Sequence, residues 1–245
     1  MNHTAQRKYL ALAGALLALS AQQAGAQIQY SSGHIDIGVA YEDGDWDLHI
    51  HDEETDVEYE PNELYFHGSE ANSSEFKLTA PGAGAFGFLG ASGDDIYIFP
   101  QVEDNGLPFI GIAAEENVLG DFIDDLLIIN MVSFSGPGSF FMYQTDGFGS
   151  PTVYFDTSDG IDSSDVYTLG VPGHAHFNYA FTEAGIYTVG ITATGTPDTP
   201  MSAESVSSTA FYTFGVNQVV PEPSAYALIA GLVGISLVGC RRRRV

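Results

Sequence analysis

Apolar and polar residues alternate along several stretches of this 245-residue chain, and this period of two limits the fold more than any other feature. In residues 34–41 every second position is apolar, and residues 173–181 alternate in the same way around Phe177 and Tyr179. Successive side chains of a β-strand point to opposite faces of a sheet, whereas a helix would scatter such a pattern around its surface. The chain is therefore expected to consist of strands that each bury one face.

Many short strands, separated by turns rich in glycine and proline, predict an all-β protein. An immunoglobulin-like antiparallel β-sandwich in one domain suits this pattern best, although the glycine-rich centre leaves room for two subdomains. Gly185 followed by Tyr187 resembles the tyrosine corner of such sandwiches. Residues 115–125 are the only stretch expected to hold a helical turn. Strands are expected at residues 34–41, 46–51, 63–67, 77–79, 96–100, 109–112, 126–135, 139–144, 152–155, 166–169, 173–181, 186–191 and 209–216.

Residues 42–45 are an acidic turn in which Asp43 precedes Gly44. An Asp-Gly pair supplies the positive φ that a tight hairpin needs, so the strands on either side are expected to be antiparallel neighbours. Their polar side chains then lie on one side of the sheet. The side chains expected to approach one another on that side are those of His34, Asp36, His49 and His51.

Two His-x-His pairs, at residues 49–51 and 174–176, suggest metal ligation. In a strand such a pair places two imidazoles on one face, with Cα atoms about 7 Å apart. Neutral imidazole suits zinc, copper, nickel or iron, whereas calcium prefers carboxylates. The candidate ligands are His34, His49, His51, His174 and His176, and the candidates for orienting these imidazoles are Asp36, Asp47 and Asn178.

A second interpretation of these histidines is that they exchange hydrogen bonds with nearby carboxylates and bind no ion. His67 stands apart from both pairs and is expected to be structural. Residues 156–165 are acidic and rich in turn formers, but they lack the ligand spacing of a calcium loop. A transition metal such as zinc is therefore expected before calcium.

The N-terminus predicts a secretory signal peptide at residues 1–26. Arg7 and Lys8 precede an apolar run over residues 9–19, and small residues end at Ala26. That run is too short to span a membrane as a mature helix. We expect cleavage after Ala26 and a folded domain at residues 27–217.

The tail, residues 218–245, contains a Pro-Glu-Pro triplet, an apolar run and a block of arginines, in that order. It resembles the PEP-CTERM sorting signal of Gram-negative bacteria. The resemblance implies recognition by a membrane exosortase, transient anchoring by a C-terminal transmembrane helix, and delivery to the cell surface or an exopolysaccharide matrix. A plain membrane anchor is the alternative. The motif residues are Pro221, Glu222, Pro223, Arg241, Arg242, Arg243 and Arg244.

The charge of the expected mature domain is extreme. Lys77 is its single basic residue against 31 acidic ones, because Glu222 alone of the 32 acids lies outside it. Nucleic acid is excluded as a partner, since phosphate binding needs lysine and arginine. Such a surface attracts cations. The only cysteine, Cys240, lies in the tail, so no disulfide holds the fold.

Several motifs together resemble the choice-of-anchor M domain, which is related to a surface-anchored repeat of actinobacteria. The resemblance spans residues 31–216 and departs from the family at Tyr179, where a tryptophan is usual. It implies a surface protein with interchangeable anchors, and some actinobacterial relatives occur beside metal-type ABC transport systems. It brings no catalytic activity and no catalytic residue. The matching motifs lie at residues 33–38, 46–52, 135–138, 173–178, 181–182 and 185–187.

Three classes of function remain open. The first is a non-enzymatic surface module that binds a transition metal. The second is a matrix or adhesion module that binds polysaccharide or protein, which exposed aromatic side chains along a groove would favour. The third is a metal-dependent hydrolase, which needs an open coordination position and a carboxylate base. No nucleophile elbow, phosphate loop or dinucleotide motif occurs in the sequence.

Overall fold

The computed structural model describes residues 26–199 and 203–221. Within this part Ile28–Val220 forms one compact unit. The predictions on residues 1–25 and on the tail from Glu222 onward, including the four arginines, lie outside the described residues. In the described part no helix is long and apolar enough to cross a membrane. The predicted domain boundaries stay predictions.

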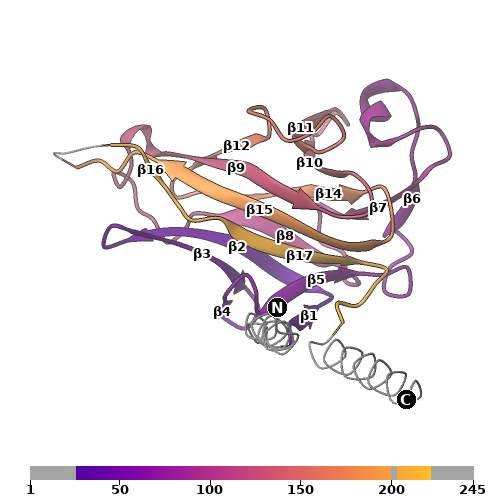
Figure 1. Ribbon diagram of the computed structural model, residues 1–245, viewed down its shortest axis with the longest axis horizontal. Coiled ribbons are helices and arrows are strands. Elements are labelled where there is room, and N and C mark those ends of the chain that lie inside the picture. Colours follow the sequence, from indigo (N-terminus) through magenta and orange to yellow (C-terminus); the bar gives the residue numbers. More distant parts are fainter. Residues whose placement is uncertain (1–25, 200–202, 222–245) are drawn as a thin grey trace, which may run out of the picture. The chain divides into compact units, whose positions relative to one another are not determined.

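The unit is all-β, as the alternation predicts, and its strands form three sheets (Figure 1). The largest sheet has seven strands in the order β1-β5-β17-β15-β9-β12, with β16 beside β15. Its long central strand β15 pairs with β9 on one side and β17 on the other. The strands are β1 (Ile28–Tyr30), β5 (Leu64–Gly68), β9 (Leu126–Ser135), β12 (Val166–Gly170), β15 (Gly185–Gly195), β16 (Ser205–Val206) and β17 (Ala210–Val216).

The other two sheets have five strands each. The site sheet, with the order β13-β8-β2-β3-β4, contains β2 (Gly33–Glu42), β3 (Asp45–Asp52), β4 (Val57–Tyr59), β8 (Pro108–Ala113) and β13 (His174–His176). The third sheet, with the order β11-β10-β14-β7-β6, contains β6 (Lys77–Thr79), β7 (Asp95–Phe99), β10 (Phe140–Thr145), β11 (Pro151–Asp156) and β14 (Asn178–Phe181). Two short 3₁₀ turns are η1 (Gly84–Leu89) and η2 (Ile123–Asp125).

One large apolar core joins the three sheets. Ile37 of the site sheet, Phe140 of the third sheet and Phe214 of the seven-stranded sheet line the same small internal space. The seven-stranded sheet therefore packs against the other two. Each fully buried phenylalanine contributes about 1.5–3 kcal/mol, which matters in a chain without a disulfide.

Two local predictions are confirmed. The turn between β2 and β3 has positive φ at Asp43 (53°) and Gly44 (96°), and the two strands are antiparallel. The Tyr187 hydroxyl donates a hydrogen bond to the backbone oxygen of Glu183 at 2.8 Å, which is the tyrosine-corner contact. The helical turn expected within residues 115–125 is the 3₁₀ turn η2, whereas η1 had no sequence signal.

The prediction of a wholly antiparallel sandwich is wrong at three pairings. Strand β5 is parallel to both β1 and β17, and β2 is parallel to β8. Parallel neighbouring strands need a long connection between them, and the connection from β2 to β8 contains the strands β3 to β7. An alternating pattern shows which face a strand buries, but not the direction of its neighbours.

The stretch at residues 173–181 is two strands, where one was expected. Strand β13 belongs to the site sheet and β14 to the third sheet, with Phe177 between them. Phe177 and Tyr179 are 0% and 2% exposed in the core. The expected division of faces thus holds, but the chain changes sheets at Phe177.

Candidate metal centre

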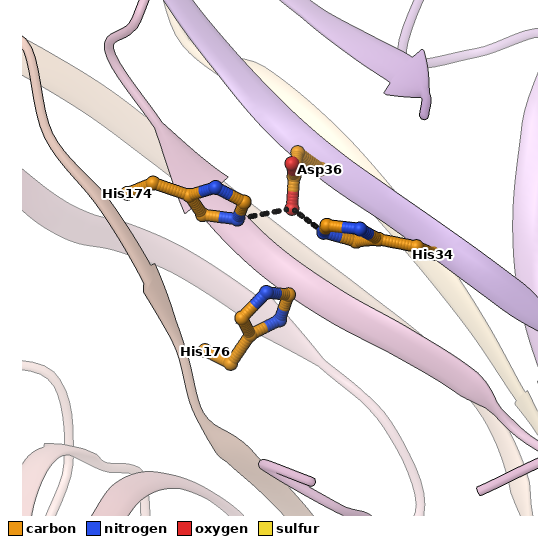
Figure 2. A group of neighbouring side chains, drawn as sticks. All are labelled: His34, Asp36, His174 and His176. Atoms are coloured by element: carbon orange, nitrogen blue, oxygen red, sulfur yellow. Dashed lines mark hydrogen bonds and ion pairs between the residues drawn. The ribbon is translucent and has the colours of Figure 1, made fainter. Parts of the chain in front are cut away.

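Strands β2 and β13 carry four polar side chains to one place on the site sheet (Figure 2). Strand β8 lies between these two strands. Asp36 of β2 and His176 of β13 both pair with Gly111 of β8, so they flank the same point from opposite sides. His34 and His174 lie two residues away on the same faces of their strands.

Gly111 provides the space in which these side chains meet. A Cβ atom at this position would overlap the Asp36 carboxylate and lie 2.7 Å from Nε2 of His174. Phe109 lies two residues before Gly111 on the same face of β8. Its ring stacks on the His176 ring, with centroids 3.5 Å apart and planes at 8°. The glycine therefore leaves the centre open, and the phenylalanine holds one imidazole beside it.

The potential ligand atoms converge closely. Oδ1 of Asp36 lies 3.1 Å from Nε2 of His174 and 3.4 Å from Nε2 of His34. One ligand atom from each of His34, Asp36, His174 and His176 lies within 4.8 Å of all the others. Three nitrogens and one oxygen at these separations form a preassembled donor set.

Several of these atoms are buried without a partner. The Asp36 side chain is fully buried, and its Oδ2 has no hydrogen-bond partner. Nε2 of His34 and Nδ1 of His176 are likewise buried without one. An ionised carboxylate held away from water costs several kcal/mol unless positive charge compensates it. A cation bound among the three imidazoles, beside Oδ1 of Asp36, would compensate the charge of this carboxylate.

The protonation states of Asp36 and His176 suit ligation, whereas a protonated His174 would release its proton on binding a metal. Burial would raise the pKa of Asp36, but the hydrogen bond from His174 and the nearby imidazoles outweigh it and lower that pKa. Burial lowers the pKa of His176 to about 4. The hydrogen bond to Asp36 raises the pKa of His174 against the opposing effect of burial. At neutral pH the centre thus offers an ionised carboxylate and a neutral His176 imidazole.

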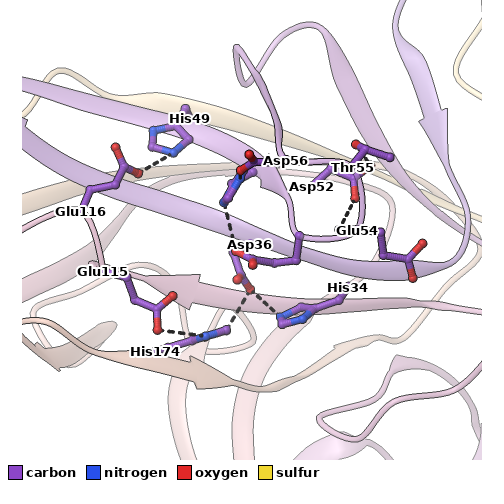
Figure 3. Close-up of polar contacts among 12 residues, drawn as sticks. His34, Asp36, His49, Asp52, Glu54, Thr55, Asp56, Glu115, Glu116 and His174 are labelled. Carbon is purple, nitrogen blue, oxygen red and sulfur yellow. Dashed lines mark hydrogen bonds and ion pairs between the residues drawn. The ribbon is translucent and has the colours of Figure 1, made fainter.

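The loop after β8 supplies a residue that the sequence analysis missed. Oε1 of Glu115 lies 3.7 Å from Nδ1 of His174, the nitrogen that points away from Asp36 (Figure 3). Such a carboxylate orients an imidazole and strengthens it as a ligand. The signal was present, because two consecutive glutamates follow the predicted strand at residues 109–112 after a gap of two residues, but their role depended on which strands lie beside β8.

Asn117 fixes the position of this loop. It is 2% exposed. Its side-chain nitrogen donates to the backbone oxygen of Val39 at 2.6 Å, and its side-chain oxygen accepts from the backbone nitrogen of Tyr41 at 3.0 Å. The loop is thereby attached to β2 where the pairing of β2 with β8 ends.

The five candidate histidines do not gather into one group. His49 lies with Glu58 and Glu116 in a second group. Both ring nitrogens of His51 face carboxylates, Glu53 at 3.0 Å and Asp56 at 3.3 Å. His51 is therefore a histidine that pairs with carboxylates, as the second interpretation of the histidines predicts. His34, His174 and His176 form the centre.

The expected orienting residues also separate. Asp36 belongs to the donor set itself. Oδ2 of Asp47 lies 3.8 Å from Nδ1 of His49. The side-chain amides of Asn178 and Gln101 face each other, with Nδ2 of Asn178 2.7 Å from Oε1 of Gln101, in the neighbouring sheet. Asn178 moves away from the imidazoles because the chain changes sheets after His176.

Two other predicted regions lie apart from the centre. His67 is 9% exposed, and its Nδ1 lies 3.4 Å from the side-chain nitrogen of Gln29, on the seven-stranded sheet. In residues 156–165 the carboxylates accept hydrogen bonds from their own loop: Asp165, for example, accepts from the backbone nitrogens of Asp156 and Asp162. Among the described residues this loop is not part of a potential metal group.

No family model, curated protein or solved structure matches the chain. The donor atoms of the centre therefore carry the information on its chemistry.

Proposed function

We propose that the protein is an exported, non-enzymatic binding protein of the cell surface or extracellular matrix that holds a transition-metal ion. His34, Asp36, His174 and His176 would be the ligands. The observation that carries this proposal is the convergence of three imidazoles on a fully buried carboxylate whose second oxygen has no hydrogen-bond partner. In a purely structural cluster the charge of this buried carboxylate would be compensated by imidazoles alone, whereas a divalent cation would compensate it fully.

The donor set favours zinc, copper or nickel over calcium. Three imidazole nitrogens suit borderline transition metals, whereas calcium takes six to eight oxygen ligands. Three nitrogens and one oxygen also complete the tetrahedral shell that zinc adopts in closed sites. The proposal therefore favours metal binding over hydrolysis, which requires an open position. Glu115 faces Nδ1 of His174, which suits an orienting role better than that of a base.

We also propose that the protein lies outside the cytoplasm, and the support for this comes from sequence patterns. It is supported by the signal-peptide pattern at residues 1–26 and by the resemblance of residues 218–245 to an exosortase-dependent sorting signal. The resemblance to the choice-of-anchor M domain supports a surface role. We further propose that the fold is immunoglobulin-like, which the tyrosine corner at Tyr187 supports.

Calorimetric titration of the purified chain tests this function. The full-length chain, kept in mild detergent and freed of metal, should bind Zn²⁺ or Cu²⁺ with better than micromolar affinity and Ca²⁺ much more weakly. The His174→Ala/His176→Ala double variant should lose at least 100-fold in affinity at this centre, since two of four ligands are gone. Absence of saturable binding, or equal binding by the double variant, would contradict the proposal.

A groove beside β17 supports polysaccharide binding as a second candidate function. Trp46 and Phe211 line it together with residues 60–62, and Phe211 is 49% exposed. Ligand-binding clefts combine aromatic side chains with a few polar groups, as this groove does. Retention of the chain on immobilised exopolysaccharide should weaken in a Phe211→Ala variant and remain in the His174→Ala/His176→Ala variant. Equal retention of the Phe211→Ala variant would argue against this candidate.

A further inference from the structure

His49 is a buried histidine that the first centre leaves unused. It is 4% exposed, and neither of its ring nitrogens has a hydrogen-bond partner. Oε1 of Glu116 nevertheless lies 3.0 Å from Nε2, at a distance typical of an ion pair (Figure 3). A buried imidazole beside a carboxylate, without a hydrogen bond between them, indicates that both groups face a common third partner.

Glu58 completes this second group. One ligand atom from each of His49, Glu58 and Glu116 lies within 4.8 Å of the other two. Glu58 lies on β4 opposite His51, so it projects from the same side of the sheet as His49. The three residues come from β3, from β4 and from the loop after β8, and the fold alone brings them together.

The space for the His49 ring is built into β2. Gly38 pairs with His49, and a Cβ atom on Gly38 would overlap the imidazole ring. The ring therefore lies over the glycine, just as the first centre lies over Gly111. Any other residue at Gly38 would push the imidazole away from the two glutamates.

We propose that His49, Glu58 and Glu116 form a second divalent-cation site next to the first. One nitrogen and two carboxylate oxygens make a harder donor set than that of the first centre, so this site suits Mn²⁺ or Fe²⁺ as well as Zn²⁺. The inference is independent of the proposed function, because the two sites share no ligand.

The two sites are nevertheless neighbours. Asp36 pairs with His51, so His49 is its diagonal neighbour across the strands, with Cα atoms about 7–8 Å apart. Consecutive residues of one loop serve the two groups, since Glu115 faces His174 and Glu116 faces His49. The outward face of the site sheet thus presents a nitrogen-rich and an oxygen-rich site side by side.

Metal stoichiometry tests the second site. The purified full-length chain would be dialysed against Mn²⁺ or Zn²⁺ in physiological salt with excess Mg²⁺, which suppresses loose counterion binding to so acidic a surface. The parent should retain two Zn²⁺ ions, and the His174→Ala/His176→Ala variant should retain one. The Glu58→Gln/Glu116→Gln variant should also retain one Zn²⁺ and should lose at least tenfold in Mn²⁺ affinity.

Matched controls separate the second site from the first. Glu58 and Glu116 are exposed, so their amide variants should fold, and Glu103→Gln removes one exposed charge that belongs to neither group. Glu103→Gln should bind both metals like the parent. A single Zn²⁺ in the parent, unaffected by Glu58→Gln/Glu116→Gln, would overturn the second site and leave the first standing. A third outcome is a single Zn²⁺ in the parent that is lost in Glu58→Gln/Glu116→Gln and retained in His174→Ala/His176→Ala. That outcome would support the second site and overturn the first.

Discussion

The two His-x-His pairs of this protein follow the same local pattern and end in different surroundings. His174 and His176 direct both imidazoles into one centre with His34 and Asp36. His49 and His51 separate: His49 lies beside Glu116, while His51 is held between Glu53 and Asp56. The comparison teaches that strand spacing places two imidazoles on one face, but the neighbouring strands and loops decide what each imidazole meets.

The difference follows from the neighbours of each strand. Strand β13 is an edge strand whose single partner, β8, carries Gly111 at the critical position and thereby opens a path to Asp36 on β2. Strand β3 lies between β2 and β4, and an acidic turn follows His51 directly. Carboxylates therefore reach His51 before another imidazole does.

The largest expected effect comes from closing the space that unites the first pair. Gly111→Ala should weaken Zn²⁺ binding at the first centre by at least 100-fold, because the new methyl group displaces the Asp36 carboxylate and the His174 ring. Overpacking should also lower the free energy of unfolding by about 1–3 kcal/mol. Calorimetry and denaturant unfolding measure the two effects.

Gly147→Ala is the matched control for this change, since a Cβ there has no atom within 4 Å. It should bind and unfold like the parent. Unchanged Zn²⁺ binding by Gly111→Ala would show that the centre does not use the space between Asp36 and His174.

The two pairs are compared directly by removing one histidine from each. His176→Ala should weaken Zn²⁺ binding at the first centre by at least about tenfold, because one of the four ligands is lost. His51→Ala should change it less than about twofold, because both His51 nitrogens already face carboxylates. Competition with a chromogenic chelator measures both values. Equal losses would mean that the pairs act as one site.

A smaller effect is expected from the two consecutive glutamates. Glu115→Gln should weaken metal binding at the first centre by about tenfold, because it loosens the orientation of His174. Glu116→Gln should leave that centre unchanged and weaken Mn²⁺ binding at the second. Parallel titrations with Zn²⁺ and Mn²⁺ distinguish these outcomes, and the same response from both variants would mean that the loop acts only through its charge.

The smallest effect concerns His67, a buried histidine that belongs to neither pair. Burial lowers its pKa below the ordinary 6.5. The unfolded chain therefore takes up a proton near pH 6.5 while the folded chain does not, so His67 costs stability as the pH falls below that value. His67→Leu should flatten the decline in unfolding free energy on that acid side. A slope identical to that of the parent would contradict this assignment.

Much of the fold and part of the centre were predictable from the sequence. The hairpin at Asp43 and Gly44, the tyrosine corner at Tyr187 and the burial of Phe177 follow from local rules of turn chemistry and strand alternation. His34, His174 and His176 are among the five candidate ligands that the sequence suggests, but the sequence also groups His49 and His51 with them, which the structure does not. Glu115 and Glu116 were not anticipated, because their roles depend on β8 lying between β2 and β13.

The sequence by itself determined which residues share a face, because the two-residue repeat of a strand is a property of the local backbone. It also determined that the chain is all-β and acidic. Only the tertiary structure decided that β2 runs parallel to β8, that the chain changes sheets after His176, and that Asp36 lies buried among imidazoles. These outcomes depend on pairings between strands far apart in the chain, which no local pattern encodes.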